Sequence, residues 1–197
     1  MNDLKKISVI ILAVLLLLPV LVSCAKTKLD TPAGMKLASV PAVDYYLYVP
    51  SEWEIVSQDG ITAAYVSVLD SSNVSCARYS VTNDAVFDTA GSEEKAEVVY
   101  AKNYWTGYLA QLKSALPGFT VIKEPEATVL DGHAAVKCSY SAVMSGKNYD
   151  FDIVICIKDK LYAYLLTFTA EETNYETDAP YFDKIVSEFR FQTGQFE

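Results

Sequence analysis

The chain has 197 residues, a formal net charge of −9 and a mean hydropathy of +0.16. An acidic protein is repelled by nucleic-acid phosphates and anionic lipid headgroups, which argues against nucleic-acid binding and against membrane attachment through a basic patch. The length suits one domain with a hydrophobic core. The 14 tyrosines favour a sheet-rich fold, because aromatic side chains prefer strands.

The first 23 residues have the parts of a secretory signal peptide. Lys5 and Lys6 form a basic head, and residues 7–22 are almost wholly apolar. This run is shorter than the roughly 20 residues that a comfortable membrane-spanning helix needs. Loss of residues 1–23 would leave a mature chain with a net charge of about −10.

The residues Leu21-Val22-Ser23-Cys24 resemble the bacterial lipobox. The resemblance implies cleavage between Ser23 and Cys24 and a diacylglycerol group on the Cys24 thiol. The protein would then be lipid-anchored to the cell membrane and face the extracytoplasmic side. Such an anchor holds stably once two fatty chains are present, because each buried methylene contributes about 0.8 kcal/mol. The alternative is an uncleaved N-terminal anchor helix that ends in an ordinary cysteine.

A flexible tether is predicted to follow the anchor. Residues 25–41 contain two prolines, a glycine and mostly small or polar side chains. A coil of this length spans on the order of 20–25 Å. We therefore expect a signal peptide at 1–23, a lipid-anchored tether at 24–42 and a single domain at 43–197.

Strand-forming segments separated by turn signals fill most of this domain. The first group is expected at 45–49, 53–57, 61–69 and 74–82, with Asp59-Gly60 as a hairpin turn. Short strands are expected at 119–122 and 128–130, followed by an antiparallel meander of 134–144, 149–157 and 161–169. The aromatic residues at the domain start are predicted to pack in the core rather than to bind a ligand; they are Tyr45, Tyr46, Tyr48 and Trp53.

Two helices are predicted. Ser92 is expected to cap the first, which ends at Pro117-Gly118. Asp178 is expected to cap the second after a polar loop, with Pro180 in its first turn. The apolar stripes at helical spacing are Val98, Trp105, Leu109, Leu112 and Leu116 in the first helix, and Phe182, Ile185, Val186 and Phe189 in the second. The order of strands, helix, strands and helix predicts an α+β fold with an antiparallel sheet covered by helices.

Several of these segments resemble the PsbP-like fold family. The matching pieces are Tyr48-Val49-Pro50-Ser51-Glu52-Trp53, Asn73-Val74-Ser75, the segment 161–167, and the helix 182–189 that runs into Phe191. The resemblance covers roughly residues 43–191. It implies a central antiparallel sheet with helices on both faces, and no enzyme activity, since relatives are mostly accessory, assembly or ligand-associated proteins.

The residues capable of chemistry form no strong constellation. His133 is the single histidine; no Gly-x-Ser-x-Gly motif supplies a nucleophile for it, and Cys138 alone makes a weak zinc partner. Asp150 and Asp152 lie two apart on a predicted strand and so share a face. Such a pair can bind a hard cation, but a solvated strand face is the favoured interpretation. No glycine-rich phosphate loop is present.

Three cysteines follow Cys24, an odd number that cannot pair fully within one chain. A two-residue loop at Gly146-Lys147 would place Cys138 opposite Ile155 and turn Cys156 to the other face of the sheet. A Cys138–Cys156 disulfide therefore conflicts with the predicted register. We expect Cys138 to be a buried free thiol, while pairing of Cys76 with Cys156 is left open.

We accordingly expect no catalytic residue, no metal site and no cofactor, with Cys24 as the one assigned site and any ligand-binding residues unknown. The first hypothesis is a non-catalytic accessory or protein-binding module. The alternative is a lipoprotein that binds a small molecule or metal ion in a pocket between sheet and helix. An exposed apolar patch would favour the first and a concave pocket with convergent polar groups the second. An enzyme would require a cluster of perturbed titratable groups.

Overall fold

The computed structural model describes residues 30–58, 61–67 and 69–192. The predicted signal peptide and its cleavage site at Ser23 and Cys24 lie outside the described residues, as does the Asp59-Gly60 turn. A compact unit begins at Thr31. Within the described ranges, no helix is both long and apolar enough to cross a membrane.

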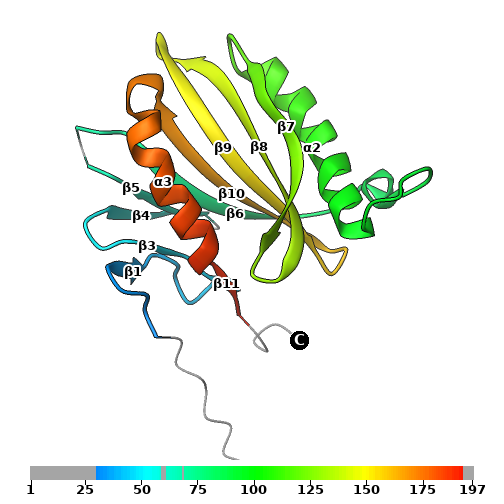
Figure 1. Ribbon diagram of the computed structural model, residues 1–197, viewed down its shortest axis with the longest axis horizontal. Helices are drawn as coiled ribbons and strands as arrows, with labels where there is room; N and C mark the ends of the chain where they lie inside the picture. The colour runs from blue at the N-terminus through cyan, green and yellow to red at the C-terminus, as the bar shows by residue number, and fades with distance from the viewer. Residues whose placement is uncertain (1–29, 59–60, 68, 193–197) are drawn as a thin grey trace, which may run out of the picture. The chain divides into compact units, whose positions relative to one another are not determined.

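A seven-stranded antiparallel sheet forms the centre of this unit (Figure 1), with the strand order β4-β5-β6-β10-β9-β8-β7. The strands are β4 (Glu54–Gln58), β5 (Ile61–Tyr65), β6 (Asn73–Ser80), β7 (Thr120–Leu130), β8 (His133–Met144), β9 (Lys147–Lys158) and β10 (Tyr162–Glu171). Two small sheets pair β1 (Met35–Leu37) with β3 (Tyr48–Pro50) and β2 (Tyr45–Tyr46) with β11 (Arg190–Phe191).

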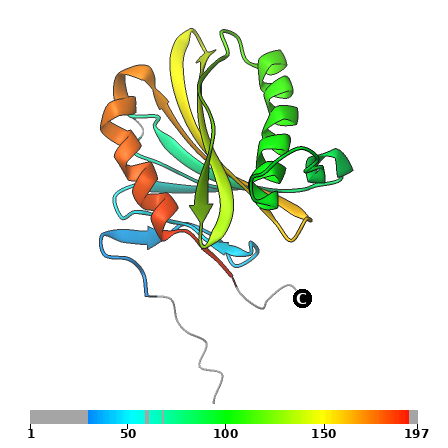
Figure 2. The same cartoon turned by 45° about the vertical axis from the view of Figure 1, so that its right-hand side comes forward.

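Helices cover both faces of the large sheet. Side chains alternate along β9, so Val154 and Cys156 belong to one core with Phe182 of α3 (Glu172–Glu188), whereas Ile153 belongs to a second core with Trp105 of α2 (Ala96–Ala115). Figure 2 shows the two helices on either side of the sheet. The expected α+β fold with a central antiparallel sheet and helices on both faces is confirmed.

Ordered structure begins earlier than the sequence analysis placed it. Residues 35–37 were assigned to the tether, but they form β1, which pairs with β3 through Met35↔Pro50 and Leu37↔Tyr48. Met35 is buried against the core that contains α3. The sequence does not predict this strand, because it has only three residues and directly follows a segment with a proline and a glycine, Pro32 and Gly34, which favour a loop.

Both predicted helix starts are wrong. Helix α2 begins at Ala96, and Ser92 Oγ instead accepts a hydrogen bond from the Glu94 amide in the preceding turn, at 3.2 Å. Helix α3 begins at Glu172, so Asp178 and Pro180 lie inside it. Polar residues dominate the first half of α3, so its sequence resembles a loop. Tyr175, Ala179 and Phe182 nevertheless recur at helical spacing, and all three pack against the core.

The strand predictions of the second half need two corrections. Strand β7 is one strand with register shifts between Val121 and Glu126 rather than two short ones. In the β8–β9 hairpin, Met144 pairs with Lys147, so the two-residue loop is Ser145-Gly146. Both loop residues have positive φ, 51° and 79°, which the tight turn requires.

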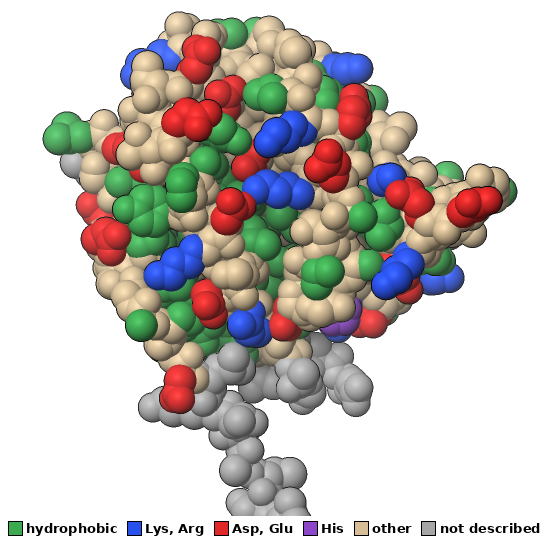
Figure 3. Space-filling model, in the orientation of Figure 1, with side chains coloured by type: hydrophobic (Ala, Val, Ile, Leu, Met, Phe, Trp, Pro, Cys, Tyr) green, Lys and Arg blue, Asp and Glu red, His purple; other side chains and the backbone are tan. Residues whose placement is uncertain are grey.

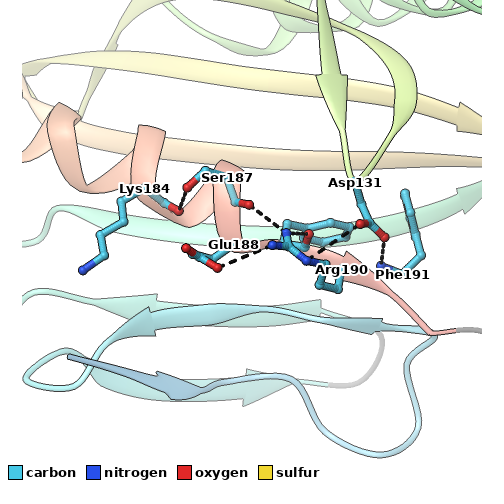
Figure 4. A network of polar contacts seen from close by, with 7 residues as sticks. Asp131, Lys184, Ser187, Glu188, Arg190 and Phe191 are labelled. Atoms are coloured by element: carbon cyan, nitrogen blue, oxygen red, sulfur yellow. Dashed lines mark hydrogen bonds and ion pairs between the residues drawn. The ribbon is translucent and has the colours of Figure 1, made fainter. Parts of the chain in front are cut away.

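A polar network fixes the C-terminal strand (Figure 4). The Arg190 guanidinium donates to the carbonyl oxygen of Ser187 at 2.7 Å and lies 3.5 Å from the Glu188 carboxylate. Asp131, in the turn between β7 and β8, accepts a hydrogen bond from the Phe191 amide at 2.8 Å. These contacts hold the chain after α3 against the sheet, where β11 pairs with β2.

Candidate binding surface

The two sequence-predicted candidates for chemistry do not form a reaction centre. His133 is exposed at the start of β8, and its ring meets Phe191 edge to face at 5.0 Å. Cys138 is fully buried in the core on the α2 side. Among the residues that the structure describes, no group of three or more His, Cys, Asp or Glu is placed to hold a metal ion.

Asp152 is buried, contrary to the favoured interpretation of a solvated strand face. Its Oδ1 accepts hydrogen bonds from Ser139 Oγ and, at 2.9 Å, from the Tyr175 hydroxyl of α3. Its Oδ2 lies 3.3 Å from Lys137 Nζ, which also contacts Asp183 at 2.7 Å. Burial and the neighbouring Asp152 charge raise the pKa of Tyr175. This arrangement ties α3 to β8 and β9.

A second carboxylate pair links α3 to the loop after β5. Burial is the largest cause that raises the pKa of Asp178; a hydrogen bond with Ser72 opposes it, and the charge of Asp70 adds to it. Burial alone would raise the pKa of Asp70 as well, but hydrogen bonds, led by that from the Ser72 amide at 2.9 Å, lower it overall. The pKa values of the two carboxyl groups therefore move in opposite directions.

The three cysteines of the described residues are all free and buried. Cys138 is therefore a buried free thiol, as expected. Cys76 on β6 and Cys156 on β9 share the opposite face, but β10 lies between their strands, where Cys76 faces Leu166 and Cys156 faces Tyr164. Strands two places apart are about 9–10 Å from each other, beyond the reach of a disulfide.

Among the described residues, no helix covers one side of strands β4, β5 and β6. Within the large sheet, α2 contacts mainly β7, β8 and β9, and α3 contacts mainly β9 and β10. On the α3 side of these strands, Ala64 and Val74 are buried to 1% or less, although Ile55 of the edge strand β4 is 40% exposed. The residues on the α2 side are partly or fully exposed. We call this surface the open face; its residues are Glu54, Val56, Ile61, Ala63, Tyr65, Asn73, Ser75 and Ala77.

The open face carries little charge, although the protein is acidic. Among its described side chains only that of Glu54 is charged, and Val56 and Ile61 are 42% and 38% exposed. Glu54 lies opposite Tyr65 at one end of the face and accepts a hydrogen bond from the Tyr65 hydroxyl at 2.6 Å. A hollow of about 430 Å³ lies over the face and is lined by Ala63, Ala64, Tyr65, Ser67, Ser71 and Asn73. By contrast, acidic and basic side chains are spread across the surface that carries α3 (Figure 3).

A cleft of about 320 Å³ lies where α2 meets the end of β6. We call it the tyrosine cleft; it is lined by Tyr79, Asn83, Val86, Asn103, Tyr104, Gly107, Tyr108 and Gln111. Its position matches the expected pocket between sheet and helix. Burial, followed by the neighbouring Tyr79, raises the pKa of both Tyr104 and Tyr108, so both phenols are neutral and able to donate at physiological pH.

The tyrosine cleft was not predicted from the sequence, although half of its signal is local. One stripe of α2, beside the buried stripe, carries the cleft residues at spacings of three and four: Asn103, Tyr104, Gly107, Tyr108 and Gln111. The stripe through Trp105 is more hydrophobic and gives the stronger sequence pattern. The other half of the cleft comes from β6 and the short helix η2 (Asp84–Phe87), whose position depends on tertiary contacts.

Residues 38–191 match the family model described as PsbP-like protein. The chain belongs to the PsbP-like protein family, and the fold and the resemblance noted in the sequence agree with this assignment. A comparison with curated protein sequences found no match.

Solved structures share the fold at low identity. LpqN of Mycobacterium tuberculosis, described as involved in cell envelope biogenesis, is 18% identical over 75% of this chain and 83% of its own, with a TM-score of 0.52. Cyanobacterial PsbP (CyanoP) of Synechocystis sp. PCC 6803 is 15% identical over 81% and 93%, with a TM-score of 0.51. The Saccharomyces cerevisiae Ran-binding protein Mog1p is 8% identical over 80% and 95%, with a TM-score of 0.50.

Proposed function

We propose that this protein is a lipid-anchored extracytoplasmic accessory protein that binds a partner protein and catalyses no reaction. The observation that carries the proposal is the open face. Interface centres are depleted in charged residues, and exposed apolar surface on a soluble domain marks sites of association. A surface of mostly small, uncharged residues, with Glu54 at one end, on a chain of net charge −9 fits that description.

Two proteins of similar fold support the proposal. One is a Ran-binding protein, which supports binding as the function, and the other is involved in cell envelope biogenesis, which supports a role at the cell envelope. Support for the membrane anchor comes from the sequence alone, through the basic head, the apolar core and the lipobox-like residues up to Cys24.

Lipid labelling tests the anchor. Cells that express the wild-type chain are grown with a labelled fatty acid, and the protein is expected to carry the label and to sediment with membranes. Cys24→Ser is expected to remove the label and prevent cleavage after Ser23. Undiminished labelling of Cys24→Ser would contradict the proposed lipidation site.

Site-specific cross-linking tests the open face. A photoreactive residue at Ala63, in the middle of this face, is expected to give a discrete adduct with one protein in intact cells. The matched control is Ala110, which is exposed on α2 away from the open face. With the purified partner, Ala63→Arg is expected to weaken binding at least tenfold and Ala110→Arg to leave it unchanged. Equal adducts from both positions, or unchanged affinity of Ala63→Arg, would contradict the proposal.

A further inference from the structure

The tyrosine cleft combines aromatic rings with carboxamides and contains no charged side chain. Its three tyrosines come from two elements: Tyr79 from β6, and Tyr104 and Tyr108 from successive turns of α2. Tyr79 is 49% exposed. Tyr104 and Tyr108 are half-buried: they pack against the α2-side core and also line the cleft. The volume of about 320 Å³ lies at the lower end of the range for small-molecule sites, about 300–1,000 Å³.

Internal hydrogen bonds orient the carboxamides of the cleft. Asn103 Nδ2 donates to the carbonyl oxygens of Val86 and Asp88, at 3.1 and 2.8 Å, which leaves its Oδ1 as an acceptor. Asn83 Oδ1 accepts from the Ala85 amide at 3.0 Å, which leaves its Nδ2 as a donor. The cleft therefore presents at least one oriented amide donor and one oriented amide acceptor beside phenol groups that can do both.

The absence of a side chain at Gly107 leaves free volume in the cleft. Gly107 lies in the interior of α2, where glycine costs about 0.5–1 kcal/mol relative to alanine. A Cβ at this position would meet no atom within 4 Å, so packing does not require glycine here. Its absence of a side chain instead leaves the helix backbone open to the cleft between Tyr104 and Tyr108.

We propose that the tyrosine cleft binds a neutral carbohydrate, with one sugar ring seated over Gly107 against the tyrosines. The C–H groups on a sugar ring face are weakly positive and suit the negative face of an aromatic ring. Sugar hydroxyls both donate and accept hydrogen bonds, so they can pair with the amide donor, the amide acceptor and the phenol groups of the cleft. This function goes beyond protein binding at the open face and does not depend on it.

The lining argues against other classes of ligand. A phosphate, a carboxylate or an ammonium group would enter the cleft without an opposite charge among the lining residues. A purely apolar ligand would offer no hydrogen-bond partner to Asn83 Nδ2 or Asn103 Oδ1, the two carboxamide atoms that the internal hydrogen bonds leave available. A neutral ligand with one apolar face and many hydroxyls meets both requirements.

Binding to an array of neutral and acidic oligosaccharides tests the inference. The full-length chain is held in a detergent without a sugar headgroup, and positives are titrated by saturation-transfer difference NMR. We expect saturable binding of a neutral sugar at micromolar to millimolar concentration. Tyr108→Ala is expected to weaken it about tenfold, since truncation removes a ring contact.

Gly107→Leu is the sharper variant, because leucine favours the helix and fills the cleft. It is expected to abolish sugar binding without lowering the unfolding midpoint. Thr106→Leu, at the neighbouring exposed position of α2, is the matched control and is expected to bind like the wild type. Absence of binding to every neutral sugar, binding of acidic sugars alone, or full binding by Gly107→Leu would overturn the inference.

Discussion

At the residue scale, the fate of a polar side chain on a strand depends on what packs over it. Asp150 and Asp152 share one side of β9, yet Asp152 is 4% exposed and Asp150 is only partly buried. The difference arises because Tyr175 and Lys137 close over Asp152 and satisfy its oxygens. Position on the strand gives the direction of a side chain, and the neighbouring elements determine its exposure.

Removal of the Asp152 carboxylate is expected to destabilise the fold. Asp152→Ala leaves the Ser139 hydroxyl without its acceptor and Lys137 without one of its two anions, which together cost about 2–3 kcal/mol. Asp150→Ala is the matched control and is expected to stay within about 0.5 kcal/mol. Urea unfolding measures both; equal effects would show that the buried network does not contribute.

The carboxyl pair of Asp70 and Asp178 predicts a pH effect. The pKa of Asp178 is raised in the folded state, so folding binds its proton more tightly, and stability from this group is lost as pH rises from its unfolded value near 4. Asp178→Asn, which resembles the protonated form, is expected to raise the free energy of unfolding at pH 7. Below pH 4 Asp178 is protonated in the wild type, so the variant is expected to have no advantage in the free energy of unfolding. An equal increase in that free energy at pH 7 and below pH 4 would contradict a raised pKa for Asp178.

At the scale of elements, α2 presents two different stripes. One is apolar and contains Val98, Trp105 and Leu112, which are buried against the sheet. The other, through Tyr104 and Tyr108, borders the cleft. The helix can carry both because residues three and four apart align along its length, so adjacent stripes can serve packing and binding separately.

The junction between α2 and β7 depends on Gly118. Its φ of +65° is unfavourable for other residues, and an added Cβ would lie 2.9 Å from Cγ2 of Val143. Gly118→Ala is therefore expected to cost more than about 1–2 kcal/mol. Gly146→Ala, with a φ of +79° but open space around it, is the control and is expected to cost only the conformational part, about 1 kcal/mol. Thermal unfolding ranks the two variants; an equal loss would exclude a contribution from Val143.

At the scale of the whole molecule, the sheet divides the interior into two cores. Cys76 and Cys156 lie in the core that contains α3, and Cys138 lies in the core that contains α2. Each thiol is reached from solvent only when its core opens. The reactivity of the three cysteines therefore measures the opening of both cores in one experiment.

The buried thiols are expected to resist alkylation until the protein unfolds. Burial raises the pKa of Cys76, Cys138 and Cys156 to about 12 each, so at pH 8 almost none is present as the reactive thiolate. Iodoacetamide is expected to modify none of the three in the folded protein and all three in denaturant, as peptide mass spectrometry would show. Rapid modification of one thiol in the folded protein would show that its core opens locally.

Local spacing was sufficient for much of the fold. It predicted the β8–β9–β10 meander, the apolar stripes of both helices and the α+β class. It also predicted the opposite faces of Cys138 and Cys156, although the hairpin register was wrong by two residues on the partner strand. Because strand side chains alternate with a period of two, a shift of two leaves every residue on its original face.

The order of strands and the two surfaces depended on long-range contacts. Strand β6 lies beside β10, which pairs residues 73–80 with residues 162–169, and no local pattern encodes that choice. Within the part of the chain that the structure describes, the same pairing leaves one side of β4, β5 and β6 without a helix and brings Tyr79 beside Tyr104 and Tyr108. Secondary structure follows from neighbours along the chain, whereas an exposed face or a cleft exists only once distant segments have packed.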